Sequence, residues 1–405
     1  MVVVDRVAET PAPPRTLAGA TVLQIVPSLQ PSHIGRVTLN TAHALVCAGA
    51  RAIVAAEDGP LKGELRAFGG EWLAYPDTTF NPIKLRSNVE LLGKIMAAES
   101  VDIVHARSAG AAWSALPVTE RFGIKLVTEL ADIPHAQMLL GGFHLRALSS
   151  GDRVITHSSF ETRPIIERYR ITPRRIKVIP RTIDVGAFNP ARVPQARVDA
   201  LRQTWGIPSG ARVVLVPGRV APWNGQIAVV DAARMLMENG MGGFTVVLAG
   251  DERRHPRYAR SILAKAQEQG VHALFRLVGH FPDLPAAFAA SDIVVMPCIK
   301  PPVTGKMAAE AQAMGRPVIA TAVGALPENM LAPPRVSDEL RTGWVVPPND
   351  PVGLARALAV ALSLDVEGYN VLALRARQFA THMFSPESVI GATLDVYNSL
   401  LQAES

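Results

Sequence analysis

The sequence contains little cysteine, few aromatic residues and no long apolar segment. Its only cysteines, Cys47 and Cys298, lie far apart in apolar surroundings. This spacing excludes a disulfide framework and offers no metal-ligand pattern. Free cysteine packs as a small hydrophobe, so we expect both residues in the core. Aromatic residues make up 5% of the chain and do not cluster with basic residues, which argues against nucleic-acid binding.

Membrane-spanning and export signals are also missing from the sequence. No apolar run reaches the roughly 18 to 20 residues that a spanning helix needs. Residues 1–16 are interrupted by Asp5, Glu9 and several prolines, so we interpret them as a flexible tail rather than a signal peptide and expect a cytoplasmic protein. The net charge of +6 favours acidic ligands or peripheral contact with the anionic inner face of the membrane. A solvated, slightly arginine-rich surface explains it equally well.

Apolar runs alternate with segments of helical composition along the whole chain. The chain has 405 residues, of which 48% are hydrophobic and 19% are charged, and this suits two globular domains. The expected strands are 22–27, 52–56, 72–75, 103–105, 126–128, 153–157, 177–180, 213–217, 244–249, 275–278, 293–296, one starting at 317, and 344–346. Helices are expected at 36–48, 61–68, 83–100, 113–122, 226–239, 258–269, 284–290, 306–314, 352–364 and 386–401. This alternation predicts α/β architecture with two doubly wound parallel sheets.

We divide the chain into four segments on this pattern. A tail covers residues 1–16, a first domain 17–190, a second domain 191–380, and a terminal helix that returns to the first domain 381–405. Residues 194–206 are interpreted as part of the connection between the domains. Two such domains that face each other leave a cleft between their sheet edges, where small molecules commonly bind.

The stretch 292–330 carries the clearest functional signal. It reads as a buried strand, a proline-rich loop, a helix that starts after Gly305, and a second strand. Amide groups at a helix start can hold an anion. Glu310 lies one turn further along, where its carboxylate could accept hydrogen bonds from a sugar hydroxyl. This arrangement suggests a nucleotide-diphosphate site, although a glutamate kept only for solubility is an alternative.

Polar residues of the first half follow the ends of several expected strands. Because ligands of parallel sheets lie at the carboxyl ends of the strands, we expect one rim made of His33, Gly35, His105, Arg107, Glu129, Asp132 and residues 158–161. His105 and Arg107 could face an acceptor. The alternative for His105 is a structural role, in which the backbone satisfies its hydrogen bonds. Glu129 and Asp132 either form an acid pair or are loop carboxylates. A structural role is favoured for His135 and His157, and a surface position for His255.

A series of segments runs in a familiar order along nearly the whole chain. In the first half they are VLQIVPSL, VDIVHARS, GDRVITHSSF and KVIPRTIDVGAFNP. In the second half they are VVLVPGRVAPWNGQ, VVLAGD, FRLVGHFPDLPAAFAASDIVVMPC, GKMAAEAQAMGRPVIATAVGALPE and RTGWVVPPND. Together they resemble glycosyltransferases of family 4, closest to bacterial enzymes of lipopolysaccharide-core synthesis. The resemblance implies the GT-B fold of two Rossmann-like domains across a cleft. It also implies retaining, metal-free transfer from a UDP- or GDP-sugar to a glycan or lipid-linked acceptor, with no cofactor.

The resemblance also assigns roles in the donor site. Arg219 matches the arginine that grips the diphosphate, a task that suits the fork of a guanidinium. Glu310 matches the last carboxylate of the E-x7-E motif, which holds the ribose hydroxyls. We therefore predict Arg219 and Glu310 as catalytic residues. The predicted donor ligands are these two with Gly35, Gly218, Asn224, Gly279, Gly305, Lys306, Met307, Gly324 and Glu328.

Five places depart from the family pattern. Asn224 replaces a phosphate-binding lysine, Pro302 replaces the first glutamate of E-x7-E, and Gly35 stands without its usual glycine neighbour. The stretch 129–132 (ELAD) follows the strand 126–128 where a histidine is common, and residues 180–184 read PRTID where the family usually has P-N-G-V-D. Losing one charge-assisted contact to phosphate costs about 1.5 to 3 kcal/mol of binding free energy.

These departures leave two questions open at the level of the sequence. Lys306 could supply the missing charge or could simply pair with Glu310 on the surface. The alternative to an active enzyme is a catalytically impaired homologue that serves as a partner or regulatory subunit. A nucleotide-sugar binding module without transfer chemistry is a weaker one.

Overall fold

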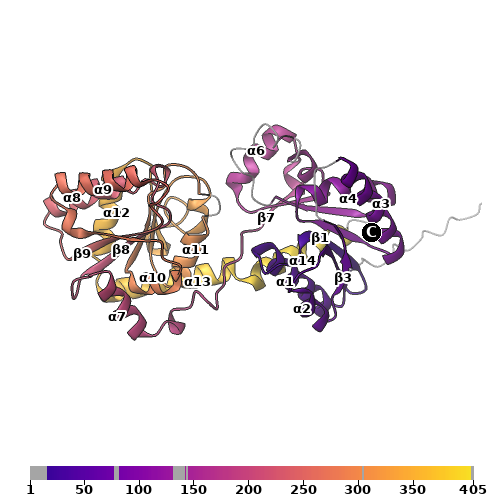
Figure 1. Cartoon of the computed structure of the whole chain (residues 1–405), viewed down its shortest axis with the longest axis horizontal. Helices are drawn as coiled ribbons and strands as arrows, with labels where there is room; N and C mark the ends of the chain where they lie inside the picture. Colours follow the sequence, from indigo (N-terminus) through magenta and orange to yellow (C-terminus); the bar gives the residue numbers. More distant parts are fainter. Residues whose placement is uncertain (1–15, 77–81, 131–141, 143–144, 303–304, 403–405) are drawn as a thin grey trace, which may run out of the picture. The chain divides into compact units, whose positions relative to one another are not determined.

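The chain folds into two compact units, which are described separately. The structure is a computed structural model that describes residues 16–76, 82–130, 142, 145–302 and 305–402. Residue contacts group Met1–Pro180 with Pro386–Ser405 as unit 1 and Arg181–Ser385 as unit 2 (Figure 1). Residues 181–190 lie with unit 2 because Phe188 packs in its core and the Ile183 amide donates to the Phe384 carbonyl. The division therefore falls at 180/181 and 385/386, where the sequence suggested 190/191 and 380/381.

Unit 1 is built on a seven-stranded sheet in the order β3-β2-β1-β4-β5-β6-β7, with every neighbouring pair parallel. Its strands are β1 Thr21–Ser28, β2 Arg51–Glu57, β3 Glu71–Ala74, β4 Ile103–Ala106, β5 Lys125–Glu129, β6 Arg153–Thr156 and β7 Ile176–Val178. Its helices are α1 His33–Cys47, α2 Lys62–Ala67, α3 Pro82–Glu99, α4 Ala109–Phe122, α6 Ser159–Tyr169 and α14 Pro386–Gln402. One face of the sheet packs on α1, α2 and α14, and the other packs on α3 and α4.

Unit 2 is built on a six-stranded parallel sheet in the order β10-β9-β8-β11-β12-β13. Its strands are β8 Arg212–Pro217, β9 Phe244–Ala249, β10 Phe275–Gly279, β11 Ile293–Met296, β12 Val318–Thr321 and β13 Gly343–Val346. Its helices are α7 Gln195–Thr204, α8 Ile227–Glu238, α9 Pro256–Glu268, α10 Leu284–Ala290, α11 Lys306–Ala313, α12 Pro351–Leu362 and α13 Val366–Phe384. Helices α8, α9 and α12 cover one face of the sheet, and α7, α10 and α11 cover the other (Figure 1).

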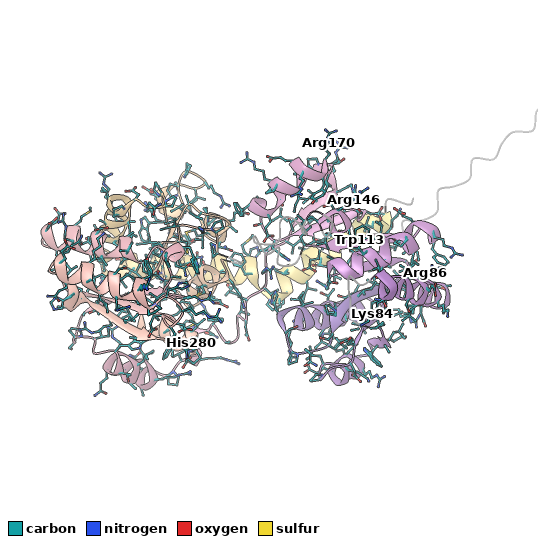
Figure 2. All side chains as sticks on the ribbon, turned by 45° about the horizontal axis from the view of Figure 1, so that its top comes forward. Lys84, Arg86, Trp113, Arg146, Arg170 and His280 are labelled. Carbon is teal, nitrogen blue, oxygen red and sulfur yellow. The ribbon has the colours of Figure 1, made fainter. Side chains whose placement is uncertain are left out.

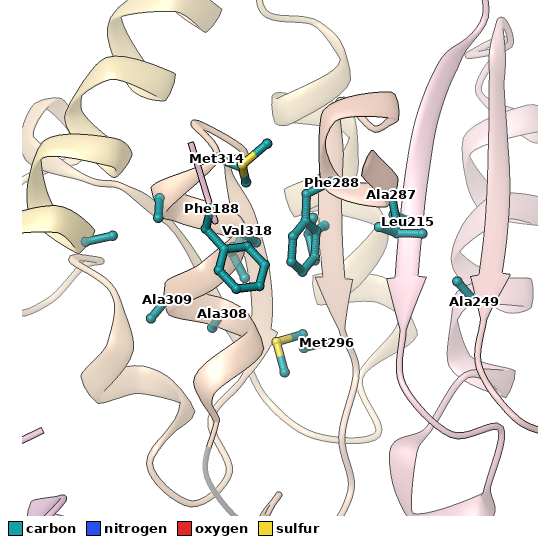
Figure 3. Close-up of a cluster of buried hydrophobic side chains, with 14 of the residues drawn as sticks. Phe188, Leu215, Ala249, Ala287, Phe288, Met296, Ala308, Ala309, Met314 and Val318 are labelled. Atoms are coloured by element: carbon teal, nitrogen blue, oxygen red, sulfur yellow. The ribbon is translucent and has the colours of Figure 1, made fainter. Parts of the chain in front are cut away.

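The core of unit 2 fixes the helix that follows the proline-rich loop. Ala308 and Ala309 of α11 pack beside Phe188, Met296 and Phe288 (Figure 3). Small alanine side chains let the helix approach the sheet closely, so its first turn is held firmly at the carboxyl edge of the strands. The predicted pair of doubly wound α/β domains is confirmed.

Three helices are absent from the sequence prediction. In α13 the buried residues are Leu372, Ala376, Ala380 and Phe384, a narrow stripe half made of alanine, which gives little apolar periodicity. Helix α6 buries only Ile165 and contains Pro164. Helix α7, predicted as connection, buries Val198 and Leu201 alone.

The two cysteines differ in their surroundings. Cys298 is buried in the core of unit 2 as predicted, whereas Cys47 is exposed, so the prediction was wrong for that residue. Cys47 is the last residue of α1, whose buried face passes through Ala42 and Leu45. A position two residues beyond Leu45 points away from that face, because consecutive helical residues are about 100° apart.

No single helix among the described residues is long and apolar enough for a membrane span. Pro351–Leu362 and Val366–Gln402 meet the requirement only as a pair, with a bend of 111° between them.

Candidate active site

Three loops meet at the carboxyl edge of the unit 2 sheet. Gly218 follows β8, and a Cβ added to it would lie 3.3 Å from Met307 Cε in the first turn of α11. Gly250 follows β9, and a Cβ there would collide with the Gly218 carbonyl oxygen. The loop after β8 is therefore sandwiched between the loop after β9 and the start of α11.

Arg219 lies in this sandwiched loop, with an exposed side chain. Its backbone carbonyl accepts hydrogen bonds from Asn224 Nδ2 at 2.7 Å and from Gln226 Nε2 at 2.9 Å. These two amides fix the turn, while the guanidinium has no hydrogen-bond or ion-pair partner among the described residues. Asn224 thus supports the backbone beneath Arg219 and supplies no cation of its own.

The start of α11 completes the edge next to Arg219. Gly305 is the N-cap residue, with φ +62°, and no side chain in the described part of the chain caps the helix there. A Cβ at Gly305 would lie 2.7 Å from Asn329 Nδ2, the far end of a side chain, so the positive φ is the main reason for a glycine at this position. Uncapped first-turn amides and the positive end of the helix dipole can hold a phosphate.

Glu310 stands one turn behind this helix start and is buried, with 5% of its surface exposed. Burial raises its pKa, and Lys306, whose Nζ lies 3.1 Å from Glu310 Oε1, opposes that effect. The predicted pair therefore forms, but it is not a surface pair. A role in solubility is also wrong, because a buried carboxylate adds little to solvation and costs free energy.

The remaining predicted ligands fall into separate places. Gly324 follows β12, and a Cβ there would lie 2.8 Å from Pro301 Cβ, so this loop touches the loop that holds Pro302 before α11. Glu328 lies in the short helical turn Leu326–Asn329, beside Asn329 and hence near Gly305. Gly279 ends β10, next to His280 (Figure 2) and two strands from β8 in the sheet.

Gly35 is the one predicted donor ligand in unit 1. It lies in the first turn of α1, where its amide donates to Ser32 Oγ at 3.1 Å, and His33 begins that helix. A Cβ at Gly35 would collide with the Gln30 carbonyl oxygen. The close packing of the helix start on the preceding loop explains a glycine at this position.

Two side chains at the unit 2 edge were missed. Trp223 is 37% exposed, and its ring meets that of His255 edge-on, with centroids 4.8 Å apart. His255 is therefore half-buried against an aromatic ring, not a free surface residue as predicted. Lys300 is exposed, and its amide donates to the Trp223 carbonyl at 3.1 Å. An aromatic residue in a loop of small and polar residues is the signal that could have identified this contact.

Three residues of the predicted rim, His105, Arg107 and Glu129, lie with His157 in one buried cluster of unit 1. Glu129 is the last residue of β5 rather than a loop carboxylate, and it contacts Arg107 and lies near His105 and His157. His105 Nδ1 is 2.7 Å from Tyr397 Oη of α14, so a side chain and not the backbone satisfies it. Asp132 and His135 lie outside the described residues.

The charges of this cluster are set by burial and by the guanidinium. Burial works to raise the pKa of Glu129, but Arg107 and the two histidines overcome it, so that pKa lies well below its usual value. Burial and Arg107 lower the pKa of His105 to about 4. Glu129 is therefore ionised and His105 neutral at physiological pH. Among the residues that the structure describes, no group of three or more histidine, cysteine, aspartate and glutamate residues could hold a metal ion.

Comparison with known proteins gives a consistent result. Residues 34–186 match the family model for Glycosyltransferase Family 4, and residues 211–363 match that for Glycosyl transferases group 1. A D-inositol 3-phosphate glycosyltransferase of Salinispora arenicola is 30% identical over 335 residues, which are 76% of this chain and 70% of the relative.

Solved structures agree with these matches. A glycosyltransferase from Rickettsia africae superimposes with a TM-score of 0.72 and 26% identity, over 95% of this chain and 99% of that one. An Anabaena protein in complex with UDP and glucose has a TM-score of 0.65 and 20% identity, over 94% and 100% of the two chains. At that identity the second likeness concerns the fold alone.

Proposed function

The chain belongs to glycosyltransferase family 4, and we propose that it transfers a sugar from a UDP- or GDP-sugar held by unit 2 to a glycan or lipid-linked acceptor held by unit 1. This proposal is supported mainly by the exposed guanidinium of Arg219 beside the start of α11, neither of which has a side-chain partner among the described residues, with the buried carboxylate of Glu310 one turn behind. Arg219 and the start of α11 would bind the two phosphates, and Glu310 would accept hydrogen bonds from the ribose hydroxyls of a nucleotide diphosphate.

In this proposal the donor is activated by electrostatic stabilisation of its leaving group. Arg219 and the amides after Gly305 hold the diphosphate, on which negative charge develops as the sugar leaves. Glu310 accepts hydrogen bonds from the ribose hydroxyls, with Lys306 balancing its charge. The remaining predicted ligands of unit 2 line the donor. The reaction retains the anomeric configuration and uses no metal.

For the acceptor we propose a carbohydrate of lipopolysaccharide or another cell-surface polysaccharide. The name of the Salinispora relative adds a second acceptor class, the cyclitol phosphates. We place the protein in the cytoplasm, with peripheral contact at the inner face of the membrane during transfer to a lipid-linked acceptor. Both acceptor classes present a ring hydroxyl to the enzyme.

A catalytically impaired partner subunit is the second candidate function. It is favoured by Asn224, which turns its amide onto the Arg219 carbonyl, and by Pro302, which can offer neither charge nor a hydrogen bond from its side chain. In such a subunit the donor site would bind nucleotide without turnover.

The two candidates are separated by nucleotide release from donor sugars. UDP-glucose and GDP-mannose are each incubated with the protein and with myo-inositol, D-inositol 3-phosphate or purified lipopolysaccharide core as acceptor. An active enzyme releases UDP or GDP with at least one acceptor. Arg219→Ala should lower that rate roughly 100-fold or more, whereas Arg356→Ala, which removes the same charge from the exposed side of α12, should leave it unchanged. Nucleotide binding without release under any acceptor would favour the partner subunit.

A further inference from the structure

A buried polar cluster of unit 1 stands at the carboxyl ends of three neighbouring strands. It consists of His105 on β4, Arg107 just after β4, Glu129 at the end of β5, and His157 just after β6. Their side chains are 0%, 3%, 14% and 11% exposed, in that order. Ligands of parallel sheets bind at this edge, so the cluster lies where an acceptor of unit 1 would bind.

Every neighbour of Glu129 is held in place by a second partner. Arg107 donates from Nη1 to Glu129 Oε2, from Nε and Nη2 to Gln24 Oε1, and from Nη2 to Thr41 Oγ1 at 3.1 Å. His105 Nε2 lies 3.4 Å from Glu129 Oε2, and its Nδ1 contacts Tyr397. The carboxylate is thus oriented by groups that cannot easily move.

The other carboxylate oxygen of Glu129 is less occupied. Oε1 lies 3.4 Å from His157 Nε2 and has no hydrogen-bond partner among the described residues. His157 is fixed through Nδ1, which is 3.0 Å from the Ile179 carbonyl oxygen. Glu129 and His157 are the two partly exposed side chains of the cluster, at 14% and 11%, and Glu129 is the one that offers only hydrogen-bond acceptors.

The chemistry of an ionised carboxylate selects its ligand. A carboxylate accepts hydrogen bonds and repels anions, whereas a histidine at this position could also donate. Its low pKa makes Glu129 a poor general base, because proton transfer is most efficient when the pKa of the base is near the working pH. A hydroxyl bound here would be oriented without losing its proton.

We propose that Glu129 is an acceptor-binding residue whose Oε1 accepts a hydrogen bond from a hydroxyl of an uncharged polyol ring, a sugar or a cyclitol. This inference rests on the proposed function, because it names the acceptor chemistry of the same enzyme. It deepens that function by placing a neutral part of the acceptor, and not a phosphate, against β5.

The test uses the full chain saturated with UDP, with myo-inositol as the probe, and measures its dissociation constant by titration calorimetry. Glu129→Gln keeps the shape of the side chain and removes its charge. Glu167→Gln is the matched control, because Glu167 is a glutamate of α6 with 71% of its side chain exposed, outside the cluster and the predicted rim. We expect binding to weaken at least about tenfold in Glu129→Gln, as for a lost charged hydrogen bond, and to be unchanged in Glu167→Gln. UDP affinity should stay the same in all three proteins.

Several outcomes overturn the proposal. They are no myo-inositol binding by the wild type, equal binding by Glu129→Gln, or an equal loss in Glu167→Gln. If Glu129→Gln does not fold, Glu129→Asp decides instead, because it keeps the charge but withdraws the carboxylate by one methylene and should also lose the probe while it keeps UDP. UDP binding without polyol binding would refute this inference alone, whereas loss of both in the wild type would refute the proposed function too.

Discussion

Replacing Arg107 with methionine tests whether the unit 1 cluster is as tightly coupled as its geometry indicates. The guanidinium is 3% exposed and contacts Glu129, Gln24 and Thr41. Methionine retains much of the apolar stem and removes every charged hydrogen bond. Glu129 would then be a buried carboxylate without its cation, and Gln24 would lose its donors.

The expected effect on stability is large. Removing one partner of a buried ion pair costs about 3 to 5 kcal/mol, against a total of roughly 5 to 15 kcal/mol for a domain. At about 2 to 4 °C per kcal/mol for a domain of this size, the melting temperature of unit 1 should fall by roughly 6 to 20 °C. Arg86→Met is the control, because Arg86 is on the outside of α3 with 86% of its side chain exposed (Figure 2), and it should change stability by less than about 0.5 kcal/mol.

The same variant should change how stability depends on pH. In the wild type the pKa of folded Glu129 is depressed, so its contribution is present above the unfolded-state pKa, about 4.3, and is lost as pH falls through the folded value. Without Arg107, the largest of the effects that lower the pKa of Glu129 is lost, so that pKa rises, and protonation relieves the penalty as pH falls. The gap between wild type and Arg107→Met should therefore be widest at pH 7 and narrower at pH 4.5.

Urea unfolding followed by circular dichroism at pH 7 and at pH 4.5 measures both effects. A loss at pH 7 below about 1 kcal/mol, in the range of exposed pairs, would refute the coupling. A gap that does not change with pH would show that Glu129 is not the group left unpaired.

Three substitutions in unit 2 give further predictions. Asn224→Lys should strengthen UDP binding about tenfold by adding a phosphate contact; calorimetry showing equal or weaker binding would speak against a diphosphate at this edge. Glu310→Gln should weaken UDP binding but leave the free protein as stable as the wild type or more so at pH 8. Burial raises the pKa of Glu310, and stability from such a group is present below its unfolded-state pKa and lost as pH rises through the folded value; a large drop in melting temperature would contradict this. Gly305→Ala should destabilise unit 2 by about 1 to 2 kcal/mol, because its φ of +62° disfavours a side chain, and an unchanged denaturation midpoint would disprove the strain.

The fold was largely predictable because its strands are buried on both faces. Such strands read as continuous apolar runs, so the ranges 244–249 and 293–296 coincide with β9 and β11. Helices were recognised where several large apolar residues face the core. Helix α13 was not, because two of its four buried residues are alanines.

In the unit 2 part of the candidate site, the placement of the local motifs in the sheet was predictable. The glycine-arginine turn and the helix start after Gly305 are local features, and both stand at the predicted edge. The orientation of Asn224 was not predictable, because it depends on a turn in which two amide side chains share the Arg219 carbonyl. The family and the GT-B fold implied by the resemblance are confirmed.

The unit 1 cluster shows the limit of reasoning along the chain. His105 and Tyr397 are 292 residues apart and meet only because α14 packs on unit 1. Glu129 looked like a loop residue because polar residues are uncommon in buried strands. Its partners Arg107 and His157 follow two other strands, so no local sequence pattern predicts the cluster.

Titration of the purified protein with UDP and GDP tests the central claim, that unit 2 holds a nucleotide diphosphate through Arg219. We predict that one of the two nucleotides raises the melting temperature. At a nucleotide concentration 100 times its dissociation constant, binding should add about 2.7 kcal/mol to the free energy of unfolding. Arg219→Ala should abolish the shift and Arg356→Ala should keep it. A shift that survives in Arg219→Ala, or no shift with either nucleotide, would contradict the assignment of the donor site.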